Sequence, residues 1–212
     1  MSDLVSNPVK PMTEINNITV YASASNSLAP VYDQAAMELG EVIATMGCGI
    51  VYGGGGVGLM GKLADAALAT GGKVAGIIPD FLDGIEHGHQ SLTTKEIVAD
   101  MRTRKQIMLD RGDAVVALPG GSGTFEELFE ALTLKRLGQY LGPIVLINTN
   151  QYYARLIEFL EQSVGEGFMQ ERHLDMWQVI EAPAELSAAF ANTVPWSADA
   201  LSFAANGSLR NV

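Results

Sequence analysis

Two glycine-rich segments, 53–61 and 120–123, each stand between a short apolar run and a stretch with the apolar spacing of a helix. Glycine adopts backbone conformations closed to other residues and allows close approach of a neighbouring chain segment. A strand that turns through glycine into a helix is a recurring unit of folds built on a parallel sheet. This pattern constrains the chain to an α/β architecture more than any other feature does.

The apolar runs that we expect to form strands are continuous rather than alternating, which is typical of a parallel sheet covered by helices on both faces. We expect strands over 18–23, 50–52, 73–78, 93–98, 114–118, 144–147 and 177–180. We expect helices over 29–46, 58–70, 101–111, 123–138, 152–164 and 183–192, with a loop at 81–90. These elements predict a doubly wound, mainly parallel, Rossmann-like sheet in a single domain over 18–192. We expect a flexible N-terminal segment at 1–17 and a loose C-terminal tail at 193–212.

The charge balance limits the partners of this chain. Lys and Arg number 13 and Asp and Glu number 24, so the net charge is −11. A field of this sign repels nucleic acid and anionic membranes, although a local cluster of N–H groups can still bind a small phosphorylated ligand. No apolar run is long enough to span a bilayer, and the first 17 residues lack the apolar core of a signal peptide. The single cysteine excludes an intrachain disulfide. We expect a cytoplasmic protein without a metal site.

Both glycine-rich segments can form anion sites, since each would place the free N–H groups of a helix N-terminus beside an adaptable backbone. The alternative interpretation is a pair of tight turns without a ligand, and two such loops at equivalent places in one sheet favour the anion sites. Neither segment has the Lys-Ser/Thr ending of a P-loop. The first resembles a dinucleotide-binding fingerprint, and Asp80 lies near the acidic position of that fingerprint. An NAD(P)-dependent oxidoreductase therefore stays open at this point.

Charged residues gather where the carboxyl edge of the predicted sheet would lie. Thr124 and Glu127 have the spacing of a capping box, in which Glu127 would only satisfy a backbone N–H. Asp100 is placed to cap the helix that follows it, whose first turns hold three cations, Arg104 and Lys105 among them. Cations there oppose the helix dipole. Such a conflict is typical of functional sites, and a bound phosphate or a carboxylate would resolve it.

Three motifs of this chain resemble those of the Lonely Guy (LOG) family of cytokinin riboside 5′-monophosphate phosphoribohydrolases, long mislabelled as lysine decarboxylases. The family pattern PGGxGTxxE stands at 119–127 without departure. The glycine loop GGGVGLMG at 54–61 and the Met-x-x-Arg-Lys helix start at 101–105 are similar to their family counterparts. The resemblance covers about 18–192. One departure is ASAS at 22–25, where the first strand of the family usually ends in Cys-Gly-Ser-Ser close to the nucleotide.

The resemblance implies an enzyme that hydrolyses the N-glycosidic bond of a purine nucleoside 5′-monophosphate, releasing free base and ribose 5-phosphate. It implies adenine or an N6-modified, cytokinin-type adenine as the base, and a homodimer or an assembly of dimers with the site near the subunit interface. It implies that Arg104 and Glu127 are the catalytic pair, with no cofactor. The residues that it implies for substrate binding are Ser23, Gly55, Met101, Lys105, Gly120, Gly121, Gly123 and Thr124.

These residue types suit glycosidic bond cleavage, which passes through an oxocarbenium-like state. Glu127 can stabilise that cation and deprotonate the attacking water, whereas Arg104 stays protonated and can only hold the substrate and orient Glu127. His87 and His89, in the predicted loop, are candidates for protonating the departing base, with a surface role as the alternative. A related family with similar loops carries molybdenum cofactor without hydrolysing it, so a carrier is the second function to test. No lysine motif for pyridoxal phosphate is present, which argues against a decarboxylase.

Overall fold

A computed structural model describes residues 15–85 and 87–200 of the chain. Its strands are β1 (Asn17–Tyr21), β2 (Gly49–Tyr52), β3 (Val74–Pro79), β4 (Thr94–Val98), β5 (Ala114–Ala117), β6 (Ile144–Ile147) and β7 (Gln178–Ile180). Its α-helices are α1 (Pro30–Thr45), α2 (Gly58–Ala69), α3 (Asp80–Asp83), α4 (Met101–Arg111), α5 (Ser122–Arg136), α6 (Ala154–Gly165) and α7 (Leu186–Ala191). Short 3-10 turns are η2 (Thr149–Gln151), η3 (Glu171–Met176) and η4 (Pro183–Glu185).

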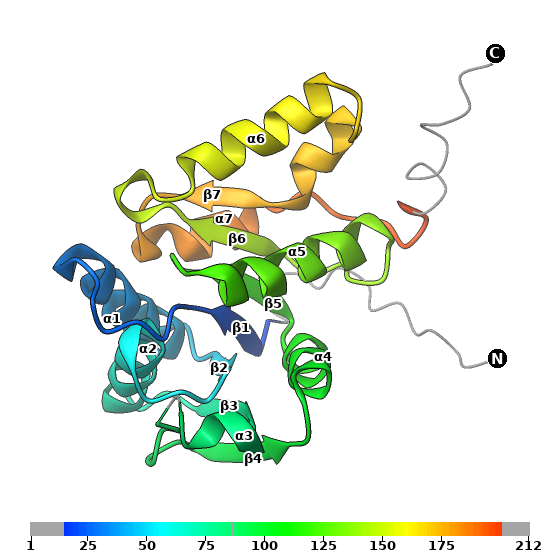
Figure 1. Ribbon diagram of the computed structural model, residues 1–212. Coiled ribbons are helices and arrows are strands. Elements are labelled where there is room, and N and C mark those ends of the chain that lie inside the picture. Colours follow the sequence, from blue (N-terminus) through cyan, green and yellow to red (C-terminus); the bar gives the residue numbers. More distant parts are fainter. Residues whose placement is uncertain (1–14, 86, 201–212) are drawn as a thin grey trace.

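The strands form one seven-stranded sheet in the order β4-β3-β2-β1-β5-β6-β7, and every neighbouring pair is parallel (Figure 1). The chain winds outward from the central β1 to β4 and then returns to place β5 on the other side of β1. The carboxyl ends of β1 and β5 therefore flank the point where the winding reverses, which is where ligands bind in open sheets of this kind. The doubly wound, Rossmann-like sheet predicted from the sequence is confirmed.

Helices cover both faces of the sheet, as the continuous apolar strands predict. Side chains of α1, α2 and α7 belong to one buried cluster, and side chains of α4, α5 and α6 belong to the other (Figure 1). Strand β5 shows the division residue by residue. Ala114 and Val116 point into the first cluster, while Val115 and Ala117 point into the second.

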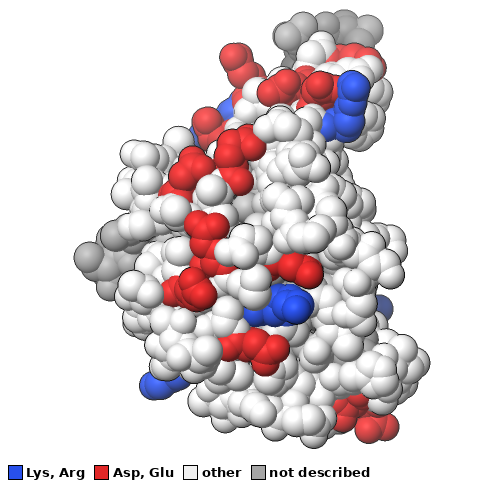
Figure 2. Space-filling model, turned by 90° about the vertical axis from the view of Figure 1, so that its left-hand side faces the viewer, with Lys and Arg blue, Asp and Glu red and all other residues white. Residues whose placement is uncertain are grey.

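Among the charged side chains on the face seen in Figure 2, red Asp and Glu outnumber blue Lys and Arg. This face agrees with the net charge of −11. None of the helices in the described part of the chain combines the length and the hydrophobicity of a transmembrane segment.

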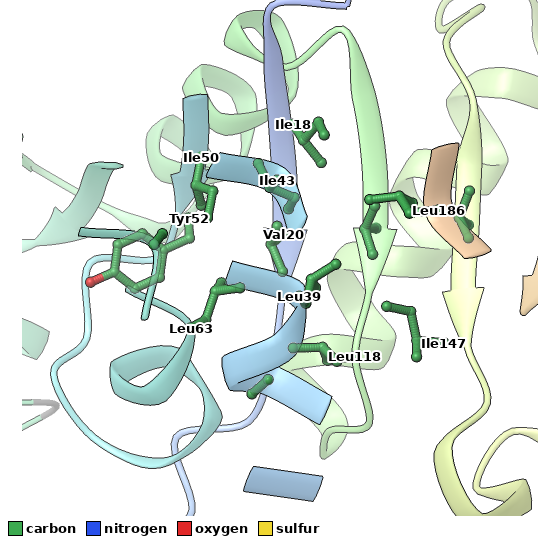
Figure 3. Close-up of a cluster of buried hydrophobic side chains, with 14 of the residues drawn as sticks. Ile18, Val20, Leu39, Ile43, Ile50, Tyr52, Leu63, Leu118, Ile147 and Leu186 are labelled. Carbon is green, nitrogen blue, oxygen red and sulfur yellow. The ribbon is translucent and has the colours of Figure 1, made fainter. Parts of the chain in front are cut away.

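The first cluster anchors β1 to its covering helix. Figure 3 shows Ile18 and Val20 of β1 beside Leu39 and Ile43 of α1, and all four side chains are almost completely buried. Burying one such side chain contributes about 1.5–3 kcal/mol. The loop that follows β1 therefore starts from a rigidly held strand.

The structure corrects two predictions near the start of helices. The segment 81–90 was expected to be a loop, but it begins inside the short helix α3. The helix predicted to start at Gly123 starts at Ser122, so Thr124 is its third residue and Gly121 occupies the N-cap position. The predicted capping box between Thr124 and Glu127 is therefore wrong, because Thr124 lies inside the helix.

The ends of the chain also differ from the prediction where they are described. Trp196 was expected in a loose tail, but it is buried and its Nε1 donates a hydrogen bond to the Lys135 carbonyl at 2.6 Å. Its indole ring gains apolar cover and its N–H gains a partner, which holds this part of the tail against α5. Ile15 is buried as well, and Asn17 already belongs to β1. Residues 1–14 and 201–212 lie outside the described residues.

Candidate active site

A cavity of about 290 Å³ opens at the carboxyl edge of the sheet, between the loops that follow β1, β2 and β5. This is the position that the winding reversal predicts for a ligand. Its lining residues are Val20, Ala22, Ser23, Ala24, Gly53, Met60, Leu82, Met101, Arg104, Gly121, Ser122, Gly123, Thr124 and Glu127. Seven of these residues are among the ten that the sequence nominated: Ser23, Met101, Arg104, Gly121, Gly123, Thr124 and Glu127.

The N-terminus of α5 forms one wall of the cavity. The first amides of an α-helix have no acceptor within the helix, and no side chain caps α5. Within the described part of the chain, the amides of Ser122, Gly123 and Thr124 have no protein acceptor. These three N–H groups, with the positive end of the helix dipole, make this wall suited to an anion.

Glu127 lies on the same helix, one turn further along, and is about nine-tenths buried. Its negative charge reaches the end of β1, where Tyr21 lies. Burial, and then the charge of Glu127, raise the pKa of Tyr21 well above its ordinary value, so this neighbour stays neutral. The carboxylate of this cavity is that of Glu127, and the neighbouring Tyr21 adds no second negative charge beside it.

Arg104 brings a buried positive charge to the cavity from α4. Asp100 caps this helix, as predicted, by accepting a hydrogen bond from the Thr103 amide at 2.8 Å. One turn later the guanidinium of Arg104 donates from Nη2 to the Gly53 carbonyl at 2.9 Å and from Nη1 towards Met101 Sδ at 3.6 Å. Only 4% of Arg104 is exposed, so the hydrogen bonds fix its head group against the first glycine loop.

Gly53 is needed for this arrangement. A Cβ atom added at Gly53 would lie 1.8 Å from Nη2 of Arg104. Glycine at the end of β2 therefore makes the room in which the guanidinium sits. The sequence motif predicted a glycine loop there, but not that its first glycine would serve an arginine 51 residues away.

Three nominated residues lie outside the cavity lining. The Lys105 ammonium pairs with the carboxylates of Glu126 and Glu130, the second at 3.1 Å, and so bridges α4 to α5. Gly55 forms an isolated β-bridge with Gly88. Gly120 packs closely against the Thr124 side chain, which leaves no room for a Cβ atom there. A carboxylate therefore resolves the predicted conflict of Lys105 with the helix dipole.

The two loop histidines nominated as proton donors do not line the cavity either. His89 Nε2 lies 3.0 Å from Asp65 Oδ1, and its Nδ1 accepts a hydrogen bond from the Ser91 amide. The His87 carbonyl accepts from the Gly56 amide at 3.0 Å. Both residues thus contribute to the structure of the loop that packs on the first glycine segment.

The sequence did not nominate the apolar part of the lining. Met60 comes from α2 and Leu82 from α3. Together with Met101 they give the cavity an apolar part, in contrast to the polar amides of α5. Leu82 could have been suspected because it follows Pro79, which ends β3 at the carboxyl edge. The described residues contain no group of three His, Cys, Asp or Glu side chains arranged to hold a metal ion.

Comparison with known proteins identifies the family. The family model described as "Possible lysine decarboxylase" matches residues 60–190. The cytokinin riboside 5′-monophosphate phosphoribohydrolase of Rhodococcoides fascians is 46% identical over 154 residues, which cover 72% of this chain and 78% of that protein. The chain belongs to the LOG family of phosphoribohydrolases. A plant member of the LOG family, LOG7 of Arabidopsis thaliana, is 39% identical over 157 residues, covering 74% of this chain and 72% of that protein.

Solved structures confirm the fold of this LOG-family chain. The molybdenum cofactor carrier protein of Chlamydomonas reinhardtii superposes with a TM-score of 0.62 at 22% identity, covering 83% of this chain and 96% of that one. The molybdenum cofactor binding protein of Rippkaea orientalis gives 0.61 at 22% identity, covering 82% and 93%. At this identity the likeness extends to the architecture alone. Membership of the LOG family rests on the closer sequence relatives.

Proposed function

We propose that the domain over 18–192 hydrolyses the N-glycosidic bond of a purine nucleoside 5′-monophosphate, with water as the second substrate and free base and ribose 5-phosphate as products. The observation that carries the proposal is the cavity in which a buried carboxylate, Glu127, and a buried guanidinium, Arg104, meet the open N-terminus of α5. The relatives named as cytokinin riboside 5′-monophosphate phosphoribohydrolases support the same reaction.

The 5′-phosphate is placed at the N-terminus of α5. The amides of Ser122, Gly123 and Thr124 supply hydrogen-bond donors, and the helix dipole favours the negative charge. Gly121 and Gly123 leave this wall without side chains. The space beside them is open, since a Cβ atom at either position would meet no protein atom within 4 Å. A phosphate can therefore approach the backbone closely.

Glu127 acts on the anomeric carbon. Cleavage develops positive charge on the ribose ring, which a carboxylate stabilises, and the same carboxylate can take a proton from the attacking water. The Arg104 guanidinium has hydrogen-bond donors and no acceptor. Its role is to hold the substrate and to orient the carboxylate from the site fixed by Gly53.

The base is adenine or an N6-modified adenine of the cytokinin type. Met60, Leu82 and Met101 provide apolar contacts for the faces of a purine and for an apolar substituent on it. Ser23, in the loop that departs from the family pattern, is the polar group of the β1 loop in this cavity.

The remaining features of the proposal concern partners. We expect a homodimer or an assembly of dimers in the cytoplasm, no cofactor and no nucleic-acid partner, since the net charge of −11 opposes a polyanion.

The second candidate function is that of a molybdenum cofactor carrier. Its support comes from structures that are 22% identical to this chain, whereas the named phosphoribohydrolases reach 46%.

Product analysis tests this function. Purified protein is incubated with AMP and with isopentenyladenosine 5′-monophosphate, and free base and ribose 5-phosphate are separated by chromatography. Glu127→Gln should lower kcat by about 100-fold or more, since a positioned general base contributes about 10²–10⁴-fold. Glu126→Gln is the matched control, because Glu126 is exposed, neighbours Glu127 on α5 and lies outside the cavity. It should retain activity within about threefold, as expected for an exposed ion pair.

The outcomes separate the candidate functions. Release of base by the wild type, lost in Glu127→Gln but not in Glu126→Gln, supports the hydrolase. Equal loss in both variants would contradict the role of Glu127. Binding of both nucleotides without release of base would contradict the hydrolase and favour the carrier. Thermal denaturation of each variant shows whether it is folded.

A further inference from the structure

Two consecutive tyrosines that follow β6, the strand next to β5, hold the second glycine loop. The Tyr152 hydroxyl donates a hydrogen bond to the Gly120 carbonyl at 2.5 Å, and the Tyr153 hydroxyl donates to the Leu118 carbonyl at 2.7 Å. The two carbonyls flank Pro119, which has no N–H. The loop between β5 and α5 is thus tied at two points to the turn that follows β6. Neither tyrosine lines the cavity.

The bond to Gly120 determines where the next amide points. The described residues contain no cis peptide bond, and a trans peptide is planar. In such a unit the C=O of Gly120 and the N–H of Gly121 point in opposite directions. The carbonyl points to Tyr152, so the Gly121 N–H points away from Tyr152, and Gly121 itself lines the cavity. A flipped peptide would present a carbonyl oxygen to any anion bound there.

Tyr152 is itself held in place. Its ring stacks on Phe125 of α5, with centroids 6.4 Å apart and planes 12° from parallel, and meets Tyr32 of α1 edge-on at 6.0 Å. The two residues before it, Asn150 and Gln151, have φ values of 53° and 58°. This left-handed conformation is uncommon for residues other than glycine and persists where the surroundings impose it.

Glu181 contributes to that constraint. It accepts hydrogen bonds from Gln151 Nε2 at 2.8 Å and from Asn148 Nδ2 at 3.1 Å.

Burial, and then the neighbouring Tyr32, raise the pKa of Tyr152. Its hydroxyl therefore stays protonated and keeps donating at neutral pH.

We propose that Tyr152 is a positioning residue for phosphate recognition, whose hydroxyl fixes the Gly120–Gly121 peptide so that the Gly121 amide joins the α5 amides as a donor to the 5′-phosphate. The proposal rests on the function proposed above, because it concerns the same phosphate site. It assigns a binding role to a side chain that touches no substrate.

Ligand binding tests the proposal without requiring turnover. The dissociation constants of ribose 5-phosphate and of adenosine, which lacks the phosphate, are measured by calorimetry for the wild type and Tyr152→Phe. Tyr152→Phe should bind ribose 5-phosphate about tenfold more weakly, because the phosphate loses a charge-assisted hydrogen bond from the Gly121 amide. Adenosine should bind unchanged within about twofold. Tyr32→Phe removes a hydroxyl that accepts a hydrogen bond from Asn150 Nδ2 at 3.5 Å, and it keeps the ring that packs on Tyr152. This control should leave both constants unchanged within about twofold.

A double-mutant cycle makes the test specific to the amide. Gly121→Pro removes the N–H in question at a residue with a φ of −89°, where an added Cβ meets no protein atom. Tyr152→Phe should weaken ribose 5-phosphate binding no further in the Gly121→Pro background. Additive losses, or equal weakening of ribose 5-phosphate and adenosine, would overturn the proposal, as would no change in Tyr152→Phe.

The same measurements separate this proposal from the proposed function. A wild type that binds ribose 5-phosphate but releases no base from any nucleotide would contradict the hydrolase, and selective weakening in Tyr152→Phe would still support the positioning role. A wild type that does not bind ribose 5-phosphate would overturn the positioning role.

Discussion

The two glycine loops occupy equivalent places, each between a strand and a helix at the carboxyl edge of the sheet, but their backbone amides have different partners. In the first loop the amides of Gly56, Gly58 and Met60 donate to the His87 carbonyl, to Asn26 Oδ1 and to the Ser23 carbonyl. In the second loop, within the described residues, the amides of Ser122–Thr124 donate to no protein atom. One helix N-terminus is therefore closed by the protein, and the other is open to a ligand.

The space around the glycines of the two loops shows the same contrast, as the position of an added Cβ atom makes clear. At Gly56, Gly58 and Gly61 it would lie 2.5 Å from a backbone atom, whereas at Gly121 and Gly123 it would meet nothing within 4 Å. Most glycines of the first loop are required by packing. In the second loop Gly120 packs against Thr124, whereas Gly121 and Gly123 are free to serve a ligand. A glycine-rich turn before a helix thus predicts where an anion site can form, while the neighbouring segments decide whether it forms.

The largest effect is expected from Gly58→Ala in the first loop. Gly58 has a φ of +60°, and an added Cβ would lie 2.5 Å from the Ala24 carbonyl carbon. The left-handed conformation and the overpacking together should cost about 3 kcal/mol, which for a domain of this size lowers Tm by roughly 6–12 °C. Thermal denaturation followed by circular dichroism measures this shift. An unchanged Tm would show that the β1 loop yields to the first glycine loop.

Gly53→Ala should separate activity from stability within the same loop. The added Cβ would meet the end of the flexible Arg104 side chain, which can move, so stability should change by less than about 1 kcal/mol. Displacing the guanidinium should lower kcat by about 100-fold, as loss of a preorganised donor does. Steady-state kinetics with AMP beside a denaturation curve checks both values. Full activity would contradict the positioning of Arg104 by Gly53.

Gly123→Ala should have the opposite signature to Gly58→Ala. Alanine is a better helix former than glycine by up to about 1 kcal/mol, so Tm should stay the same or rise. The new methyl group projects into open space at the cavity wall and should weaken ribose 5-phosphate binding about tenfold by blocking close approach. Calorimetry compares it with the wild type. A lower Tm with unchanged affinity would make the two glycine loops alike.

Lys105→Met should have the smallest effect. Lys105 bridges α4 to α5 through Glu126 and Glu130, whose side chains are 55% and 41% exposed. Exposed ion pairs contribute about 0.2–1 kcal/mol, so kcat/KM for AMP should fall by no more than about fivefold. A loss above about 30-fold would return Lys105 to the place beside the nucleotide that the family resemblance implies.

The sequence predicted the elements that depend on local pattern. The strand at 144–147 matches β6 at both ends, because a continuous apolar run between turn residues has few alternatives. Asp100 was assigned correctly as a cap, since capping depends on neighbours along the chain. Long-range contacts were not predictable in this way. Trp196 was placed in a loose tail because no local signal announces its partner, Lys135, 61 residues away.

The sequence also predicted part of the cavity lining. Motif residues such as Arg104 and Glu127 line the cavity, because each motif follows a strand and parallel strands end at one edge. Leu82 was missed because a short helix replaces the expected loop. Tyr152 was missed because its hydroxyl acts through a carbonyl 32 residues away. The motif predicted that Lys105 lies beside the nucleotide, but its side chain pairs with Glu126 and Glu130 of α5.

A crystal structure of Glu127→Gln with AMP tests the contrast between the two loops most directly. Loss of the carboxylate should preserve the substrate long enough to be seen. The phosphate oxygens should lie about 3 Å from the amides of Ser122, Gly123 and Thr124 at the open N-terminus of α5. A phosphate bound at the N-terminus of α2, or outside the cavity altogether, would contradict the assignment of the second glycine loop as the phosphate site.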